Sequence, residues 1–303
     1  MVKISIIGAN GFIGKNLTNK LIQNKRYKLK LFGRTSNSLN IASIPYHQIN
    51  LNNKQEIFEK IGDSDVVYYL ASSSIPSDSW DNPIKEAQDN LFPFLNFLEA
   101  ITKSNVKKII FTSSAGTVYG PSSIKISEND NKQPFSPHGI NKLSMEYYLK
   151  YYSMKNDVFF DIYRISNIYG EGQNTKKGLG VINTFLENII TKKSITVFGD
   201  GENIRDYIHI DDVVNILSFS TQEITSTSNT FNLSSNEYFS INELIRIIKE
   251  ITIEDFNIKY IPGRKSDNPA IILDNSKIAK KYPNYNFTKI KEGILKTYLD
   301  LKN

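Results

Sequence analysis

The 303-residue chain contains no cysteine, and it has only three histidines, three methionines and one tryptophan. The absence of cysteine excludes disulfides, thiol catalysis and cysteine-ligated metal. The histidines stand far apart, at positions 47, 138 and 209, so a histidine-rich metal site is not expected. We therefore predict that the protein binds no metal.

Long apolar runs are missing as well. No stretch approaches the ~20 apolar residues that a membrane helix needs, so we expect no membrane partner. The N-terminus enters an apolar, β-branched stretch at residues 2–7, which predicts a strand and not a signal peptide. The content of 40% hydrophobic and 22% charged residues is typical of a globular protein. Together these features favour a cytoplasmic protein.

The formal net charge is +6, but no long block of lysine or arginine accompanies it. A nucleic-acid-binding protein would gather its basic residues on one face or motif. Here they are spread over predicted helix surfaces such as 246–249 and 278–281, so we expect no nucleic-acid partner. A smaller anion, such as a diphosphate, fits the positive excess equally well.

A glycine-rich turn follows the first predicted strand and precedes an amphipathic helix at 15–24. A strand, such a turn and a helix in this order are the context of a dinucleotide fingerprint, because the glycines let a pyrophosphate approach the helix N-terminus. A plain strand-to-helix turn is the alternative. The predicted cofactor contacts in this turn are Gly8, Asn10, Gly11, Phe12, Ile13 and Gly14.

Gly33 and Arg34 directly follow the second predicted strand, 28–32. An NAD site usually places an acid there for the ribose 2′-hydroxyl, whereas an arginine suits a 2′-phosphate and favours NADP over NAD. Arg34 could instead stack on adenine or face solvent. Asn50, at the end of the third strand, meets the adenine edge or forms an ordinary turn. The further cofactor contacts that we predict are Leu51, Ala71, Ser72 and Asn90.

Alternating strands and helices over residues 2–111 predict an α/β fold with a doubly wound parallel sheet, a Rossmann domain. We expect this dinucleotide-binding domain to cover 1–165, with 205–235 returning to it. Residues 166–204 and 236–303 are predicted to form a smaller C-terminal α/β lobe. Because ligands of doubly wound sheets bind outside the carboxyl ends of the strands, this lobe is expected to bind the substrate.

Two segments suggest proton-transfer chemistry. The stretch 111–120 reads as a strand that opens into a loop with the hydroxyls of Ser113, Ser114 and Thr117. The stretch 136–142 enters a helix, with Lys142 four residues after His138. A hydroxyl cluster beside a titratable group and a lysine is an arrangement suited to general acid–base catalysis.

With these segments, the chain resembles the extended short-chain dehydrogenase/reductase family, in particular its nucleotide-sugar epimerases and dehydratases. The motifs that carry the resemblance are the glycine turn 8–14 and the blocks 65–71, 113–120, 164–170 and 199–209. The resemblance implies NAD(P) in the first domain, a nucleoside-diphosphate sugar under the second, and a role in polysaccharide biosynthesis. It implies that Asn167, Arg205 and Arg264 bind the diphosphate, and that a homodimer forms through helices 92–103 and 141–155.

The chain departs from the family at its reactive centre. The family pairs a tyrosine with a lysine as Tyr-x-x-x-Lys, and a serine or threonine precedes this pair in the sequence. Lys142 is present, where the family uses it to bind the nicotinamide ribose, but His138 stands at the tyrosine position. Ala115 stands at the usual hydroxyl position, so Thr117, Ser114 or Ser113 must supply the hydroxyl, and Thr117 is favoured.

A second Tyr-x-x-x-Lys match begins at Tyr151. It lies between two and three helical turns beyond Lys142, roughly 15 Å away, so we interpret it as a chance match.

His138 is chemically able to replace the tyrosine. A histidine begins near a pKa of about 6.5, and positive neighbours lower this pKa further, which keeps the imidazole neutral and basic at neutral pH. Imidazole is shorter than phenol by roughly 2 Å, so a water or a shifted substrate is needed. The alternative is that His138 only packs at the helix start and the site is inactive.

These residues leave several functions open. The first is a 4-epimerase, with His138 as the base, Thr117 as the orienting hydroxyl and Lys142 as the ribose ligand. The second is an NADPH-dependent 4-keto-sugar reductase, which Arg34 supports. A dehydratase is least favoured, because 115–117 lacks the acidic residue that the family's dehydratases carry beside their threonine. A catalytically silent protein that binds nucleotide sugars or NADP is the remaining hypothesis.

Overall fold

The computed structural model describes residues 1–35, 44–74, 79–122, 124–175, 180–224, 227–263 and 270–302. The chain forms two compact units. The first comprises residues 1–118, 132–164 and 214–231, and the second comprises 119–131, 165–213 and 232–303. Within the described ranges, none of the helices has the length and apolar character needed to cross a membrane.

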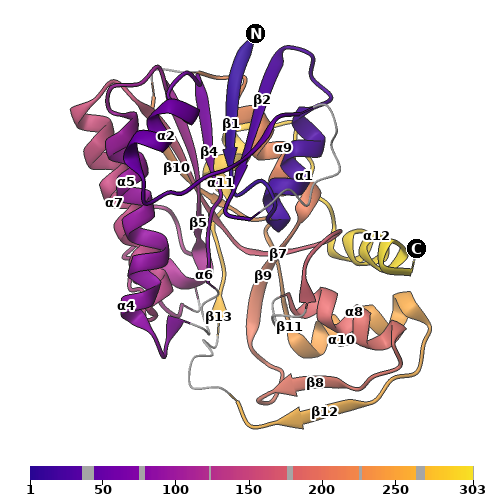
Figure 1. The fold of residues 1–303 in the computed structure, drawn as a ribbon. Coiled ribbons are helices and arrows are strands. Elements are labelled where there is room, and N and C mark those ends of the chain that lie inside the picture. Colours follow the sequence, from indigo (N-terminus) through magenta and orange to yellow (C-terminus); the bar gives the residue numbers. More distant parts are fainter. Residues whose placement is uncertain are drawn as a thin grey trace. The chain divides into compact units, whose positions relative to one another are not determined.

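A seven-stranded sheet organises the first unit, in the order β3-β2-β1-β4-β5-β6-β10 (Figure 1). The strands from β3 to β5 pair in parallel. The chain winds outward from β1 on both sides, as in a Rossmann sheet, so the predicted doubly wound α/β fold is confirmed. The strands are β1 (Val2–Ile7), β2 (Tyr27–Gly33), β3 (Tyr46–Gln48), β4 (Val66–Tyr69), β5 (Lys108–Ser114), β6 (Phe159–Ile165) and β10 (Asn229–Leu233).

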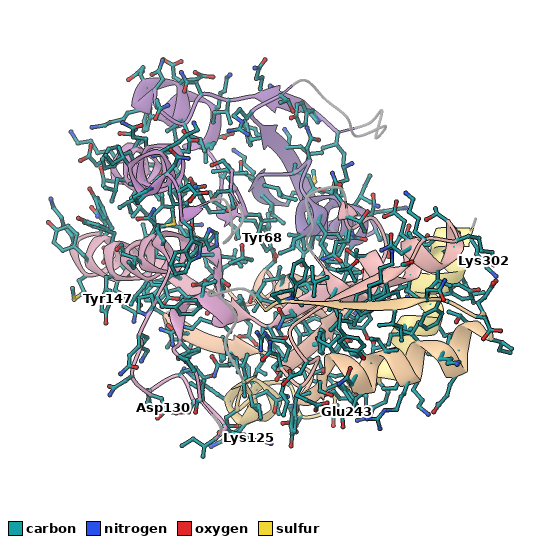
Figure 2. The ribbon with its side chains drawn as sticks, turned by 90° about the horizontal axis from the view of Figure 1, so that it is seen from below. Tyr68, Lys125, Asp130, Tyr147, Glu243 and Lys302 are labelled. Atoms are coloured by element: carbon teal, nitrogen blue, oxygen red, sulfur yellow. The ribbon has the colours of Figure 1, made fainter. Side chains whose placement is uncertain are left out.

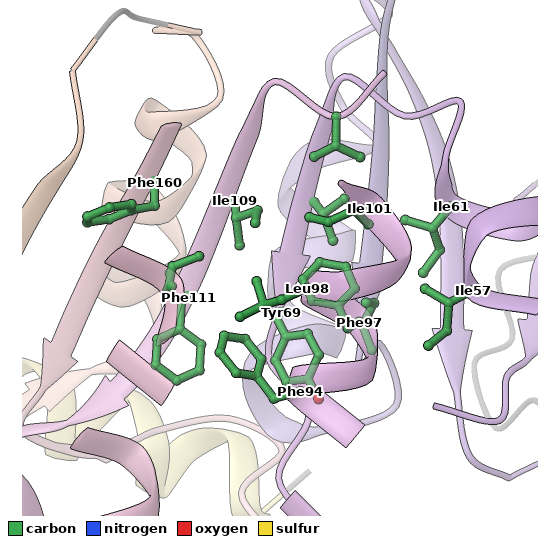
Figure 3. Packing of buried hydrophobic residues seen from close by; sticks show 14 of the residues in the cluster. Ile57, Ile61, Tyr69, Phe94, Phe97, Leu98, Ile101, Ile109, Phe111 and Phe160 are labelled. Atoms are coloured by element: carbon green, nitrogen blue, oxygen red, sulfur yellow. The ribbon is translucent and has the colours of Figure 1, made fainter. Parts of the chain in front are cut away.

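Helices cover both faces of this sheet. Figure 1 shows α2 (Lys54–Ile61), α5 (Phe92–Ile101) and α7 (Pro137–Lys155) on one side, and α1 (Phe12–Leu21) and α9 (Ile210–Ser220) on the other. Alternate residues of β4 point to opposite faces of the sheet. Tyr69 packs among Phe94, Phe97 and Phe111 (Figure 3), whereas the Tyr68 hydroxyl donates to the Leu217 carbonyl of α9 at 2.7 Å. Both faces are therefore buried, as parallel sheets require.

The helix predicted over 84–103 is interrupted. It consists of α4 (Pro83–Glu86), a π-helical turn η1 (Ala87–Leu91) and α5. Pro93 has no amide hydrogen to donate to the preceding turn, so regular α-helical hydrogen bonding is interrupted at this point. The interruption leaves Glu86 and Asn90 buried, with 3% and 7% of their surfaces exposed.

Helix α7 begins at Pro137, two residues before Gly139, where the sequence suggested that the helix starts. Ser136 is its N-cap, because the Ser136 hydroxyl accepts a hydrogen bond from the Gly139 amide at 3.2 Å. Pro137 occupies the first helical position, where its missing amide hydrogen costs nothing. His138 consequently lies in the first turn of a 19-residue helix and not in the loop before it.

The second unit is built around β9 (Ile204–His209), which pairs in parallel with β7 (Asn167–Tyr169) and β13 (Ala270–Ile271) and antiparallel with β11 (Glu237–Ser240). Because β9 pairs here, residues 205–213 cluster with this unit, although the sequence suggested their return to the first. The chain returns at 214 instead. The other elements of this unit are α8 (Val181–Ile190), β8 (Ile195–Phe198), α10 (Ile241–Thr252), β12 (Ile258–Ile261), α11 (Ser276–Lys281) and α12 (Ile290–Lys302).

Candidate active site

The glycine turn joins β1 to α1 through contacts that leave no room for side chains. Gly8 has a φ of 90°, and a Cβ on it would lie 2.8 Å from the Ala71 amide nitrogen. A Cβ on Gly14 would lie 2.2 Å from the Gly8 carbonyl oxygen. The turn thus carries the start of α1 against the carboxyl ends of β1 and β4.

The start of α1 suits the pyrophosphate of a dinucleotide. Its N-cap is Gly11, and no side chain caps the helix. The amide hydrogens of the first turn, which includes Phe12 and Ile13, are therefore free to bind a phosphate near the positive end of the helix. The buried Oδ1 of Asn10 also has no hydrogen-bond partner within the described residues. The residues of this turn fit the group that the sequence predicts.

The end of β2 is occupied by a tyrosine from β3. The Asn10 side-chain amide donates to the Tyr46 hydroxyl at 2.6 Å, and that hydroxyl donates to the Thr35 carbonyl at 2.7 Å. A Cβ on Gly33 would lie 2.4 Å from the same hydroxyl. A side chain at position 33 would therefore have to displace the Tyr46 hydroxyl, and Arg34 next to it is exposed.

Asn50 and Leu51 follow β3. The Asn50 side chain accepts a hydrogen bond from the Asn52 amide at 3.0 Å, which is the turn alternative considered from the sequence. Leu51 is partly buried against the core that α2 and α5 share. Contact of either residue with adenine stays a prediction.

Asn90 fixes the loop that follows β4. Its Oδ1 accepts hydrogen bonds from the Ser73 amide at 2.8 Å and the Ser73 hydroxyl at 3.1 Å, and its Nδ2 donates to the Ser74 hydroxyl at 3.2 Å. Ala71 is half-buried in this loop, and Ser72 is exposed. The structure thus brings three of the predicted cofactor residues together, with Asn90 as the support.

The hydroxyls after β5 have different surroundings. Ser113 is committed to the protein, because its hydroxyl donates to Glu146 Oε1 at 2.6 Å, and the other oxygen of Glu146 accepts from Arg164 Nη2 at 2.6 Å. Ser114 is half-buried. Thr117, in the short helix α6 (Ala115–Val118), is only 6% exposed, and its Oγ1 has no partner in the part of the chain that the structure describes.

Close packing joins α6 to the first turn of α7. A Cβ on Gly139 would lie 2.1 Å from the Thr117 carbonyl oxygen, so only glycine permits this approach. By contrast, a Cβ on Gly116 would meet no atom within 4 Å. Thr117 and His138 are therefore held on neighbouring turns beside open space.

His138 is paired with a carboxylate that the sequence did not suggest. Its Nδ1 lies 3.2 Å from Glu86 Oε1, and the side chains are 8% and 2% exposed. Burial lowers the pKa of His138 below its ordinary 6.5, and the charge of Lys142 lowers it further, while Glu86 opposes both. The imidazole is consequently neutral at neutral pH, as the sequence predicts.

Lys142 lies one turn further along α7. Its Nζ donates to the Thr112 carbonyl at 3.1 Å and stands 5.1 Å from the centre of the Phe111 ring. Burial lowers the pKa of Lys142 to about 8, although Glu86 and Glu146 oppose this shift. The cation is thus anchored at the end of β5, where a parallel sheet receives its ligands.

Two predicted substrate residues belong to the second unit. Asn167 of β7 is exposed, and its Nδ2 donates to the Asp206 carbonyl at 2.9 Å. Arg205 of β9 is half-buried, and its Nη1 donates to the Ile204 carbonyl at 2.9 Å. Because β7 and β9 pair, the two side chains come from neighbouring strands. Arg264 lies outside the described residues.

Tyr151 occupies a different part of α7 from the site. It is 49% exposed and its ring meets the edge of Tyr152. Its interpretation as a chance match agrees with this location.

Comparison with known proteins identifies the family. The model of the NAD dependent epimerase/dehydratase family matches residues 4–234 of this chain. The chain belongs to this epimerase/dehydratase family. Membership confirms the resemblance drawn from the motifs, the enzymatic class, and NAD(P) as the cofactor class.

Individual relatives match from four fifths to nearly all of the chain. It is 32% identical, over 99% of its length and 98% of the relative's, to a Methanocaldococcus jannaschii protein provisionally named UDP-glucose 4-epimerase. It is 31% identical to an Escherichia coli dTDP-4-dehydro-6-deoxyglucose reductase, over 81% and 80% of the two chains. The UDP-glucose 4-epimerase of Thermotoga maritima, solved with UDP-glucose, superposes with a TM-score of 0.92 at 28% identity, covering 99% of both chains.

Sequence reasoning missed Glu86 and Tyr46. Glu86 could have been found, because it precedes Asn90 by four residues on a predicted helix and so shares its face. Tyr46 carried no local signal, since its role depends on the pairing of β2 with β3. The Glu146–Arg164 ion pair was likewise hidden, because it joins a helix to a strand.

We predict opposite effects on stability for two hydroxyl deletions in the protein without ligands. Thr117→Val removes a buried hydroxyl that has no partner among the described residues, so the free energy of unfolding should stay level or rise by up to about 1 kcal/mol. Ser113→Ala removes a charge-assisted hydrogen bond to Glu146 and should lower that free energy by about 1.5–3 kcal/mol. Urea unfolding measures both. A loss for Thr117→Val as large as that for Ser113→Ala would show that Thr117 is structural and not reserved for a ligand.

Proposed function

We propose that the protein is a 4-epimerase of a nucleoside-diphosphate sugar in which His138 replaces the family's tyrosine. The observation that carries the proposal is the combination of a neutral buried imidazole, an unpartnered buried hydroxyl on Thr117 and an anchored ammonium on Lys142. General base, orienting group and cation are the parts that oxidation of a sugar hydroxyl requires. The 32% and 28% identical relatives named as UDP-glucose 4-epimerases support UDP sugars as the substrate class.

Each residue has a role at a stated atom. NAD(P), when bound, would supply the acceptor for the hydride from sugar C4 and the donor for its return to the other face of the turned keto sugar. Nε2 of His138 accepts the proton of the C4 hydroxyl as this hydride leaves, and gives it back when the hydride returns. The Thr117 hydroxyl orients the sugar oxygen. Lys142 binds the ribose next to the nicotinamide, and its charge keeps His138 neutral.

Asn167 and Arg205 are the proposed ligands of the diphosphate, together with Arg264. An arginine that bonds two phosphate oxygens gives both energy and orientation. These contacts fix the nucleotide part of the substrate, so that the keto sugar can turn without leaving the site.

The test is interconversion of UDP-glucose, UDP-N-acetylglucosamine and UDP-glucuronic acid with their C4 epimers. We expect His138→Ala to lower kcat by roughly 10²–10⁴-fold, the usual contribution of a general base. Tyr151→Phe, on the exposed part of α7, is the matched control and should keep full activity. Equal activity of His138→Ala and the wild type would refute the role of His138, and wild-type inactivity on the whole panel would refute the 4-epimerase.

The pH dependence of this activity follows from the lowered pKa of His138. The imidazole must be neutral to accept the proton, so kcat/KM should be level around pH 7 and fall only as pH decreases below the ordinary 6.5. Measuring kcat/KM across this range tests the sign. A rate that instead rises as pH decreases through that range would contradict the base.

We further propose NADP(H) as the preferred cofactor. Gly33, the Tyr46 hydroxyl and the exposed Arg34 support this preference, because they offer the adenosine ribose a cation and no carboxylate. The same preference favours a second candidate function, an NADPH-dependent 4-keto-sugar reductase, to which the 31% identical Escherichia coli relative also points. Denaturing the purified protein separates the two, since a stoichiometric, tightly retained dinucleotide favours the epimerase and an empty site refilled by NADPH favours the reductase.

Two sets of variants test the cofactor preference. Arg34→Ala should weaken NADPH binding about tenfold through loss of a charge-assisted contact, whereas the control Arg26→Ala, at the other end of β2, should not. Gly33→Asp alone should impair both cofactors, because its Cβ meets the Tyr46 hydroxyl at 2.4 Å. Adding Tyr46→Phe leaves the nearest ring carbon at 3.4 Å and should produce preference for NADH. Binding is measured by fluorescence titration, and an unchanged preference in the double variant would contradict the proposal.

Finally, we propose a homodimer that forms through the outer faces of α5 and α7. Large side chains are exposed there: Tyr147 is 59% exposed, Met154 82% and Phe92 51%. Figure 2 shows Tyr147 at the outer side of α7, in contrast to Tyr68 among the strands. Tyr147→Glu with Met154→Glu should convert a dimer into a monomer in light scattering, while Leu299→Glu on α12, 53% exposed, should not. A monomeric wild type would refute the dimer.

A further inference from the structure

Glu86 is a buried carboxylate with a small set of partners. It ends α4 at the point where the helix changes to the π turn, and it is 3% exposed. Burial raises its pKa, but hydrogen bonds from His138 and Ser74 and the nearby charges outweigh this, so the pKa of Glu86 is lowered overall. Glu86 is therefore ionised at neutral pH, next to the imidazole.

An ionised carboxylate restricts the histidine to one tautomer. Because a carboxylate only accepts hydrogen bonds, Nδ1 of His138 must carry the hydrogen that faces Glu86 Oε1. In a neutral ring, Nε2 then has a free lone pair. Nδ1 is the ring nitrogen that faces Glu86, so Nε2 lies on the other side of the imidazole. The contact thus turns the basic nitrogen away from Glu86.

A tyrosine at position 138 would not need this partner. A phenol has one oxygen and no tautomers, and a carboxylate beside it would raise its pKa by repelling the phenolate. For a histidine the same carboxylate is favourable, because it selects the tautomer and stabilises the imidazolium that forms on protonation. Glu86 therefore suits His138 and opposes the residue that the family uses.

We propose that Glu86 is the positioning residue that makes His138 a competent replacement for tyrosine, by holding Nδ1–H and presenting the Nε2 lone pair to the substrate hydroxyl. The inference rests on the proposed function of His138 and names what that function requires. In the step itself, the sugar O–H and C4–H bonds break, the Nε2–H bond and the C4=O double bond form, and the hydride with its two electrons would be taken up by the oxidised nicotinamide of the bound cofactor. Glu86 stays ionised throughout.

The charges around His138 explain why His138, with Glu86 beside it, can also return the proton to the substrate. Glu86 of α4 and Lys142 of α7 are the charged groups that face the imidazole. Burial and Lys142 disfavour the imidazolium, whereas Glu86 favours it. Without Glu86, a protonated His138 would be buried beside the Lys142 cation and would have no anionic partner. Uptake of a proton by His138 would then be suppressed.

The first experiment needs no activity. Nitrogen-15 NMR of labelled histidine, with His138 assigned by the His138→Ala spectrum, reports the tautomer and the pKa in the purified protein. We expect the Nδ1–H tautomer in the wild type, its loss in Glu86→Leu, and a lower His138 pKa in both Glu86→Leu and Glu86→Gln. The control is Asp89→Asn, which removes a partly exposed carboxylate from the next turn, where Asp89 pairs with Lys85. This variant should change neither the tautomer nor the pKa of His138. An unchanged tautomer and pKa in Glu86→Leu would overturn the inference.

The second experiment compares the effect of Glu86→Gln on kcat in the wild type and in a His138→Tyr background, where we expect opposite changes. Glu86→Gln should lower kcat by about 10–10³-fold with little change in KM, and Glu86→Asp should restore part of the loss. In a His138→Tyr background, the same Glu86→Gln change should raise kcat, since it removes the charge that opposes the phenolate. A decrease in both backgrounds would show that Glu86 is only structural. If the wild type is inactive on all substrates, the proposed function fails, and the NMR result still decides the role of Glu86.

Discussion

Three positions at which a Cβ has no space determine how the site is assembled. Gly8, Gly14 and Gly139 each touch backbone from another turn, at hypothetical Cβ distances of 2.8, 2.2 and 2.1 Å. The first two hold α1 against the ends of β1 and β4, and the third holds α7 against α6. Because backbone carbonyls cannot move aside as flexible side chains can, these contacts fix where both helices begin. The cofactor turn, Thr117 and His138 all depend on these starting points.

Buried charged pairs stabilise this arrangement, and they differ in their roles. Lys108 and Asp161 join β5 to β6 at 2.6 Å, and Glu146 and Arg164 join α7 to β6 at 2.6 Å. Both pairs are almost completely buried, so each ion needs its partner to offset the cost of leaving water. The third buried pair, Glu86 with His138, contains an imidazole whose pKa is lowered by burial. We propose proton exchange with a substrate for this pair, whereas the other two pairs hold the strand and helix that support it.

Sequence reasoning succeeded where the pattern is local. The glycine turn and the alternation of strands and helices are both read within short windows, whereas the replacement of the family's tyrosine by His138 stays a prediction. It was less accurate where a distant residue decides. The predicted helix over 84–103 is divided because Pro93 interrupts its hydrogen bonding, and residues 205–213 join the second unit because β9 pairs with β7, β11 and β13. Asn50 illustrates an alternative left open by the sequence, since its side chain supports a turn in the structure.

The sequence by itself determined the fold class, the cofactor class and the family, because these depend on residue types at fixed spacings along the chain. It also placed His138 at the position where we propose the reactive group. Only the tertiary structure decided which groups surround that imidazole. Glu86 and His138 are 52 residues apart in sequence, and they meet because α4 and α7 lie on the same face of the sheet. The hydroxyl of Tyr46 reaches Gly33 and Asn10 only through the pairing of β2 with β3. Such contacts leave no local pattern, since each partner alone has the character of an ordinary helix or strand residue.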